Sequence, residues 1–260
     1  MEFISSRENP IIKDVKKLKE KKYREEKKQF FIEGLRFVSE ALESDFEVPI
    51  VFISENMVTK FENFNIKNKT KIYCLSKRVF KDISSTENPQ GIAAVVNYNN
   101  INIKNREGFY VLTDKVQDPG NLGTIIRSAH ASNALGVIIT KGTVDVYNDK
   151  TLRSTMGSIF HIPIIQDEDL TYLSKLRDAG FKLVVSSLDT DKNFYQVDLT
   201  GNLIIAVGNE GAGISSDIME LSDVKVKIPM PGGAESLNVS AAASIMMFEV
   251  VRQNCLQPRG

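Results

Sequence analysis

Hydrophobic positions along the chain alternate between two spacings, one typical of helices and one typical of buried strands. In the first hundred residues, apolar positions three and four residues apart predict helices, and short β-branched or aromatic runs predict strands. The predicted helices cover residues 11–28, 35–42 and 76–83, and the predicted strands cover residues 30–32, 48–53, 72–75 and 92–96. Elements that alternate in this way are sufficient for a small α/β unit.

The alternation begins again after residue 108. The predicted helices there are 122–132, 152–161, 170–179 and 239–253, and the predicted strands are 109–113, 137–140, 162–165, 182–186 and 203–207. Strands that alternate with helices indicate βαβ units and a mainly parallel sheet. Ligands of such sheets lie beyond the carboxyl ends of the strands, where this chain has its glycine-rich and polar turns.

A short polar stretch, rich in asparagine, separates the two halves. We therefore predict an N-terminal α/β domain at residues 1–98, a linker at 99–107 and a larger C-terminal α/β domain at 108–260. A chain of 260 residues is long enough to give each domain its own core.

Charge is balanced over the whole chain but not along it. The 33 basic and 33 acidic residues cancel, whereas residues 1–28 contain ten Lys or Arg against six Asp or Glu. A basic arm on a mildly acidic body suggests a polyanionic partner, although a solvated, Lys-rich helix explains the same charges.

Cysteine and histidine usage argues against a metal or a disulfide framework. The two cysteines, Cys74 and Cys255, and the two histidines, His130 and His161, have no metal-ligand spacing. The N-terminus lacks the plan of a signal peptide, and no apolar run approaches the roughly 20 residues that span a bilayer. We expect a cytoplasmic protein without a metal or a membrane segment.

Residues 228–247, IPMPGGAESLNVSAAASIMM, join an extended segment to a helix through a glycine turn. Ser236, Leu237 and Asn238 stand just before the apolar stripe that begins at Val239, where an Asn or Ser fits an N-cap. Taken alone, this is a strand, a turn and a capped core helix that any α/β domain could contain.

Two further turns follow predicted strands. In DPGNLGTIIRSAHASNALG, Asn121 stands near a helix start, where free N–H groups favour anions, and Arg127 lies off the apolar face. The strand at 203–207 runs into GNEGAG at 208–213, the reverse of the dinucleotide fingerprint, and Glu210 would repel a pyrophosphate. The alternative without a catalytic role is an N-cap asparagine, a surface arginine and a glycine turn with an exposed carboxylate.

The familiar catalytic patterns do not occur: we find no Ser-His-Asp or Cys-His arrangement, no carboxylate pair at a spacing that points to glycosidase chemistry and no P-loop. The polar set suits a neutral or cationic cofactor held by backbone groups, with an arginine that steers a phosphate-bearing substrate.

The three motifs together resemble those of the SpoU/TrmH family of RNA ribose 2′-O-methyltransferases. They are N-x-G-x-x-x-R at 121–127, G-N-E-G-x-G at 208–213 and I-P-M-x-G-x-x-E-S-L-N-V-S-x-A at 228–242. The first hundred residues, with FFIEGLRFVSEAL and NPQGIAAVV, resemble the substrate-binding domain often fused to that family, which has the fold of small ribosomal RNA-binding proteins.

The resemblance implies a catalytic α/β domain with a mainly parallel sheet and a deep trefoil knot, an S-adenosylmethionine pocket made by the knotted turns, and a homodimer whose site is completed across the interface. By motif position it assigns cofactor binding to Gly208, Ile228 and Leu237, with no metal. It assigns the catalytic site to five polar residues, Arg127, Asn121, Glu210, Ser236 and Asn238.

The implied reaction is methyl transfer to a ribose 2′-hydroxyl, with Arg127 acting on the hydroxyl directly or through the substrate phosphate. The fused N-terminal domain favours 23S ribosomal RNA as the substrate over tRNA. A tRNA 2′-O-methyltransferase, a non-catalytic RNA-binding or ribosome-assembly factor, and a base methyltransferase of the same architecture stay open. The intact polar residues argue against the non-catalytic factor, and the first motif favours the ribose over a base.

Overall fold

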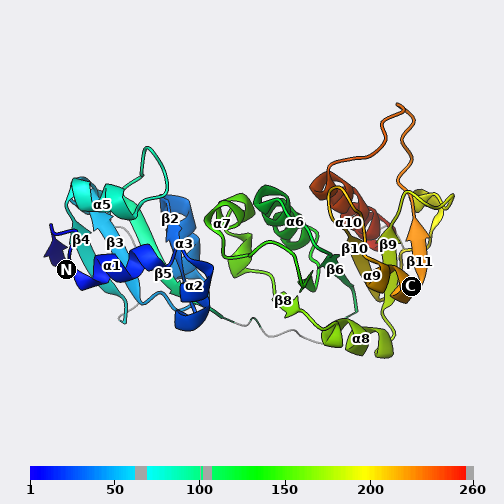
Figure 1. Ribbon diagram of the computed structural model, residues 1–260, viewed down its shortest axis with the longest axis horizontal. Coiled ribbons are helices and arrows are strands. Elements are labelled where there is room, and N and C mark those ends of the chain that lie inside the picture. The colour runs from blue at the N-terminus through cyan, green and yellow to red at the C-terminus, as the bar shows by residue number, and fades with distance from the viewer. Residues whose placement is uncertain (62–68, 100, 102–106, 256–260) are drawn as a thin grey trace. The chain divides into compact units, whose positions relative to one another are not determined.

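The computed structural model describes residues 1–61, 69–99, 101 and 107–255, which form two compact units (Figure 1). The first unit holds residues 1–100 together with 147–160, and the second holds 101–146 and 161–260. Most of the predicted linker at 99–107 lies outside the described residues. No helix in the described ranges is long and apolar enough to cross a membrane.

The first unit is built on a mixed five-stranded sheet in the order β1-β4-β3-β5-β2. Strands β1, β4 and β3 run parallel, and β5 is antiparallel to both β3 and β2. The strands are β1 (Glu2–Ile4), β2 (Gln29–Glu33), β3 (Ile50–Ser54), β4 (Lys71–Leu75) and β5 (Ile92–Asn97). The apolar runs predicted all of them except β1, which is too short to show a pattern.

Helices cover this sheet, and the predicted helix at 11–28 is in fact two helices. The break is stabilised by the Arg24 guanidinium, whose Nη1 donates to the carbonyls of Leu18 and Lys19 at 2.7 and 2.8 Å. The helices are α1 (Pro10–Lys17), α2 (Lys21–Lys27), α3 (Leu35–Glu43), the 3-10 turn η1 (Glu55–Met57), α4 (Val58–Phe61) and α5 (Lys77–Ile83).

A segment from the second half of the chain completes the core of the first unit. It contains α7 (Asp149–Thr155) and the 3-10 turn η2 (Ser158–Phe160). The Phe160 ring lies 5.1 Å from that of Phe46 and 5.4 Å from that of Phe37, between centroids. Met156 adopts a φ of 51°, which ends α7 and makes the single helix predicted at 152–161 wrong.

The second unit has a six-stranded sheet, entirely parallel, in the order β11-β9-β10-β6-β7-β8, which confirms the predicted fold class. Three of the four interior strands, β10, β6 and β7, are buried throughout, as their mainly apolar runs predict. The strands are β6 (Phe109–Thr113), β7 (Gly136–Thr140), β8 (Ile164–Asp167), β9 (Lys182–Ser186), β10 (Leu203–Val207) and β11 (Val224–Val226).

The helices of this unit are α6 (Pro119–Ala131), α8 (Thr171–Asp178), the 3-10 turn η3 (Phe194–Gln196), α9 (Ser216–Leu221) and α10 (Val239–Cys255). Helix α10 packs against α6 and β10. Helix α6 begins at Pro119, before the predicted start, because Asp118 is its N-cap and accepts from the Asn121 N–H at 2.9 Å. Since β6 and β10 are neighbours, the turns that follow them meet at the carboxyl edge of the sheet.

Candidate functional site

The first two motifs meet through the Glu210 carboxylate. Its Oε2 accepts from the Gln117 N–H at 3.1 Å. Its Oε1 accepts from the Asp118 N–H at 3.1 Å and from Asn121 Nδ2 at 2.9 Å. Because Asp118 and Asn121 belong to the start of α6, the carboxylate ties the turn after β10 to the helix start after β6.

These hydrogen bonds also determine the charge of Glu210. Partial burial raises the pKa of its carboxyl, but the donors from Asn121, Gln117 and Asp118 favour the ionised form and together lower the pKa below its usual value. Glu210 is therefore a carboxylate at neutral pH, and it acts as an acceptor and an anion in this position.

The third motif joins the same network through asparagine side chains. Asn238 Nδ2 donates to Asn121 Oδ1 at 2.9 Å. Since a carboxylate only accepts, Glu210 requires the Asn121 NH₂ on its side and leaves the Asn121 oxygen for Asn238. Asn238 Oδ1 then accepts from the Ser240 N–H at 2.9 Å and caps α10, which confirms the predicted N-cap.

The glycine-rich turn after β10 owes its shape to a close backbone contact. A Cβ at position 208 would lie 2.2 Å from the carbonyl carbon of Gly213, so only glycine fits there. The Asn209 N–H donates to the Gly213 carbonyl at 2.8 Å, and the reverse bond is 2.9 Å long. Asn209 Nδ2 donates to the Lys115 carbonyl at 2.9 Å and so binds this turn to the segment after β6.

Asp114, directly after β6, is a structural residue of the site that the sequence reasoning missed. Its side chain is buried, and it accepts from Thr140 Oγ1 at 2.9 Å and from the Ser215 N–H at 2.7 Å. It therefore connects the ends of β6 and β7 to the segment after the glycine turn. An acidic residue that follows an apolar strand at the carboxyl edge of a sheet is the signal that could have identified it.

The other third-motif residues are placed differently. Ile228 is 9% exposed, whereas residues 231–237 are all exposed and form the loop, coloured orange, that projects from the second unit (Figure 1). Leu237 is 37% exposed. Within the described residues, the Ser236 side chain makes no hydrogen bond. The structure thus brings Asn121, Glu210 and Asn238 together but leaves Ser236 and Leu237 in the exposed loop.

Arg127 lies in the second half of α6, exposed, without a hydrogen bond or ion pair to any described residue. The next residue, Ser128, forms a 2.8 Å hydrogen bond with Ser244 of α10, which holds α6 in place. The guanidinium is therefore carried on a fixed helix with its five donors available to a bound substrate.

Matches to known protein families cover most of both units. Residues 108–248 match the SpoU rRNA Methylase family, and residues 9–94 match the MRM3-like substrate binding domain. The 23S rRNA (guanosine(2553)-2′-O)-methyltransferase RlmP of Bacillus subtilis is 36% identical over 96% of this chain and 99% of its own. The 23S rRNA (uridine(2479)-2′-O)-methyltransferase of Streptomyces viridochromogenes is 31% identical over 86% of this chain and 83% of its own.

Solved structures give the same result. The AdoMet-bound rRNA methyltransferase of Sinorhizobium meliloti has a TM-score of 0.87 and 32% identity, covering 96% of this chain and 97% of its own. AviRb of Streptomyces viridochromogenes in complex with AdoMet has a TM-score of 0.87 and 29% identity, covering 96% of this chain and 100% of its own. These likenesses confirm the predicted family, enzyme class and cofactor. Since the family pattern covers more than half of the chain, the protein belongs to the SpoU rRNA Methylase family of RNA methyltransferases.

Proposed function

We propose that this protein transfers a methyl group from S-adenosylmethionine to a ribose 2′-hydroxyl of 23S ribosomal RNA. The observation that carries the proposal is the hydrogen-bonded chain Glu210–Asn121–Asn238, which links the three motifs at one edge of the sheet. The relatives that act on 23S rRNA align along most of this chain, including the N-terminal unit, and this favours ribosomal RNA over tRNA. An rRNA substrate would place its activity in the cytoplasm.

The residues around the glycine turn fit a sulfonium cofactor. The only charged side chain in the stretch 208–213 is the Glu210 carboxylate, whose sign suits a cation. Residues 211–213 are exposed, so their backbone is open to a ligand, and Leu237 offers apolar surface. We assign cofactor binding to Gly208, Ile228 and Leu237. When bound, S-adenosylmethionine supplies a methyl group on an excellent leaving group.

Arg127 is the residue we assign to the substrate. A ribose 2′-hydroxyl is a weak nucleophile and must lose its proton during transfer. An arginine side chain stays protonated, so we give Arg127 the role of orienting the hydroxyl and the adjacent phosphate through its planar donors. Glu210, Asn121 and Asn238 hold the start of α6, on which Arg127 is carried. Ser236 belongs to the exposed loop, and we assign it to the substrate side of the site.

We also propose that the enzyme is a homodimer with its site completed across the interface. Phe248 on α10 is 49% exposed and offers the kind of aromatic side chain that is enriched in protein interfaces. Burial of this ring against a second copy would place α6 and α10, and with them Arg127, near the interface. Sedimentation velocity measures this directly: the wild type should sediment as a dimer and the Phe248→Asp variant as a monomer.

The function is tested by a tritiated-methyl transfer assay on unmodified 23S rRNA, with tRNA as a parallel substrate. Label in 23S rRNA that appears in alkali-resistant dinucleotides identifies ribose methylation. Label in tRNA alone, label in a base, or no transfer to either RNA contradicts the proposal. The unmodified substrate is 23S rRNA purified from a strain that lacks the gene.

A further inference from the structure

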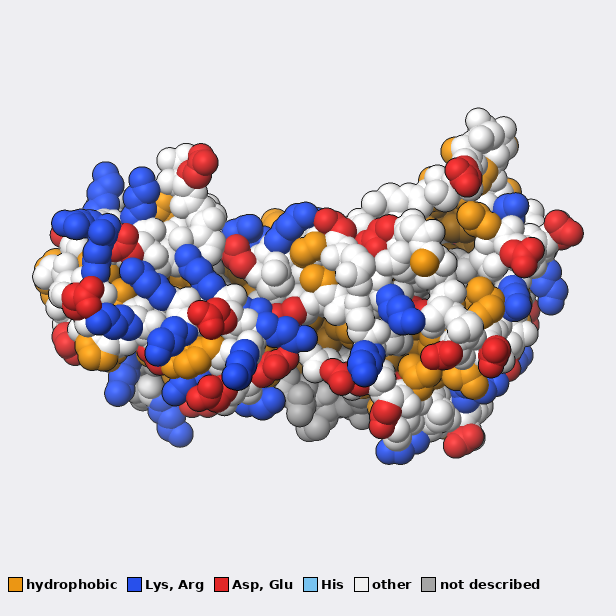
Figure 2. All heavy atoms as spheres, viewed as in Figure 1, with side chains coloured by type: hydrophobic (Ala, Val, Ile, Leu, Met, Phe, Trp, Pro, Cys, Tyr) orange, Lys and Arg blue, Asp and Glu red, His pale blue; other side chains and the backbone are white. Residues whose placement is uncertain are grey.

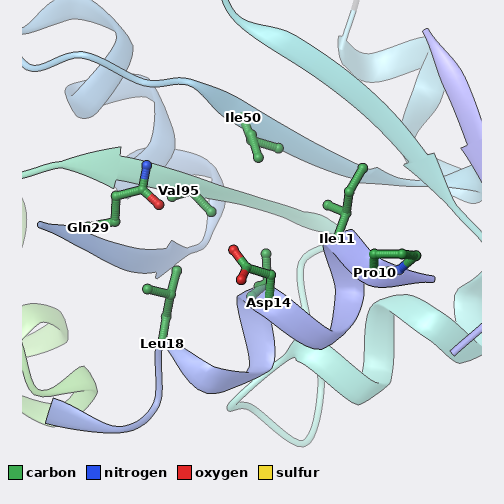
Figure 3. A pocket seen from close by; sticks show the side chains of 8 residues that line it. Pro10, Ile11, Asp14, Leu18, Gln29, Ile50 and Val95 are labelled. Atoms are coloured by element: carbon green, nitrogen blue, oxygen red, sulfur yellow. The ribbon is translucent and has the colours of Figure 1, made fainter. Parts of the chain in front are cut away.

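The N-terminal unit has a pocket of about 280 Å³ between α1 and residues of β2, β3 and β5. Figure 3 shows the Asp14 carboxylate and the Gln29 amide among apolar side chains that include Ile11, Leu18 and Ile50. Pockets that enclose a whole small molecule span about 300–1,000 Å³. This one therefore has room for a flat base rather than for a complete nucleotide.

The orientation of the Gln29 amide follows from its neighbours. Asn97 Nδ2 donates to Glu47 Oε2 at 2.7 Å, and a carboxylate can only accept. The Asn97 oxygen is therefore left to face Gln29, whose Nε2 donates to it at 2.9 Å. This leaves the Gln29 oxygen as the atom offered to the pocket, without a partner among the described residues.

Asp14 presents a second acceptor. The Tyr23 hydroxyl donates to Asp14 Oδ1, and no described residue donates to the other carboxylate oxygen. The hydrogen bond to Asp14 raises the pKa of Tyr23 to about 12, so the hydroxyl keeps its proton at neutral pH. Tyr23 thus fixes one oxygen of the carboxylate and leaves the other oxygen for a ligand.

A ligand that fills this pocket must be flat and apolar on its faces and must present two donors on one edge. Among the four RNA bases only guanine does so, through N1–H and the 2-amino group; uracil would place a carbonyl oxygen against the carboxylate. We propose that this pocket binds a guanine base of the RNA substrate, exposed in a loop or turned out of a helix. The proposal rests on the proposed function, because it takes the substrate to be RNA.

Cations lie beside the pocket, where the phosphates of the same strand would pass. The ammonium groups of Lys17 and Lys27 each lie 5.5 Å from the centroid of the Tyr23 ring. Neither lysine forms an ion pair within the part of the chain that the structure describes. Figure 2 shows further Lys and Arg side chains gathered on the face of this unit that carries α1 and α2. Phosphate contacts of this kind supply affinity without sequence preference.

The first test measures the binding of GMP, IMP, AMP, CMP and UMP to the full-length protein by NMR titration, with S-adenosylmethionine present to fill the cofactor site. IMP lacks only the 2-amino group of GMP. We expect GMP to bind about tenfold more tightly than AMP or UMP, which is the discrimination expected from hydrogen bonds between a carboxylate and a base. GMP should bind several-fold more tightly than IMP. Equal affinity for the five nucleotides, or no binding of GMP, overturns the proposal.

The second test compares Asp14→Asn with Glu25→Gln, which removes the same charge from an exposed residue of α2 that pairs with Lys21. If Asp14 were only a surface acid, both variants would bind nucleotides equally or more tightly, because each loses a repulsive charge. We expect Asp14→Asn instead to weaken GMP about tenfold and to abolish the preference over IMP. Unchanged or higher GMP affinity in both variants overturns the proposal.

Both tests are independent of methyl transfer. If the wild type methylates 23S rRNA but binds all nucleotides alike, the pocket assignment is wrong and the proposed function stands. If the protein prefers GMP but methylates no RNA, the proposed function is wrong. The pocket would then be a guanine site for a ligand other than a methylated RNA substrate.

Discussion

Two parts of the second unit, both built from family motifs, differ in how the chain holds them. The junction of the first two motifs is fixed by the three donors to Glu210, by the paired backbone bonds of Asn209 and Gly213, and by buried Asp114. The loop at 231–237 is exposed along its whole length, and its Gly233 N–H donates to the carbonyl of Met230, just before the loop, at 3.0 Å.

The difference indicates which residues serve the fold and which serve the ligand. Side chains of the junction satisfy one another, so their removal leaves polar groups without partners and lowers stability. Side chains of the loop contact little of their own chain, so their removal costs little stability and affects whatever covers the loop. Arg127 belongs to neither class, because its helix is fixed and its guanidinium is free.

The largest effect is expected for Arg127→Ala, which removes the free guanidinium without changing the junction or the loop. Methyl transfer should fall by about 10²–10³-fold or more, the loss found when one charge-stabilising donor is removed from an active site. Arg127→Lys should fail as well, because a point charge does not replace a planar fork. The measurement is single-turnover transfer to 23S rRNA.

Cofactor titration by calorimetry provides the control for this variant, and affinity should stay within about twofold of the wild type because Arg127 is assigned to the substrate. Turnover near that of the wild type in Arg127→Ala would remove Arg127 from the mechanism.

The second prediction concerns the loop. Leu237→Ala should weaken cofactor binding about tenfold, because a leucine that becomes covered contributes about 1.5–3 kcal/mol. The free energy of unfolding without cofactor should change by less than about 0.5 kcal/mol. The matched control is Leu188→Ala, since Leu188 is 53% exposed outside the motifs and should leave both quantities unchanged. Unchanged affinity in Leu237→Ala would remove it from the cofactor site.

The sequence predicted the parts of the structure that depend on local pattern. The strands at 182–186 and 203–207 occur as predicted because each contains a short β-branched apolar run bounded by polar or turn residues. Asn238 caps α10 because an asparagine just before an apolar stripe favours the N-cap position. The family motifs singled out Asn121, Glu210 and Asn238, which the structure brings together.

Features that depend on distant residues could not be predicted in this way. The packing of Phe160 requires aromatic residues more than a hundred positions away. The break between α1 and α2 is local, but it is held by the polar Arg24 side chain, which the spacing of apolar residues does not register. The hydrogen bond from Asn238 to Asn121 joins residues 117 positions apart, and no periodicity registers such a contact. The guanine pocket likewise combines α1 with three strands.

The third prediction tests the link between the junction and α10. Asn238→Ala removes the N-cap and the bond to Asn121, and it should destabilise the protein by about 1 kcal/mol, within the usual range for a lost cap. For a chain of this size the melting temperature should fall by about 2–4 °C. Ser236→Ala, two residues earlier in the exposed loop, should melt like the wild type. Equal melting of both variants would show that the cap contributes nothing.

The smallest effect is the pH dependence of the Glu210 contribution. The pKa of Glu210 is lowered in the folded protein, so its ionised form stabilises the fold above the unfolded pKa near 4.5, and this contribution is lost as the pH falls through the folded value. Because Glu210 is exposed, the difference in unfolding free energy between wild type and Glu210→Gln should be below about 1 kcal/mol at pH 7.

The same difference should shrink toward zero as the pH falls below about 4.5, since the protonated carboxyl and the amide then both carry a hydrogen toward the donors. Urea unfolding of both proteins at several pH values between about 3 and 7 measures it. If the difference in unfolding free energy persisted unchanged below pH 4, the shape of the Glu210 side chain rather than its charge would hold the two motifs together. The junction would then not depend on an anion.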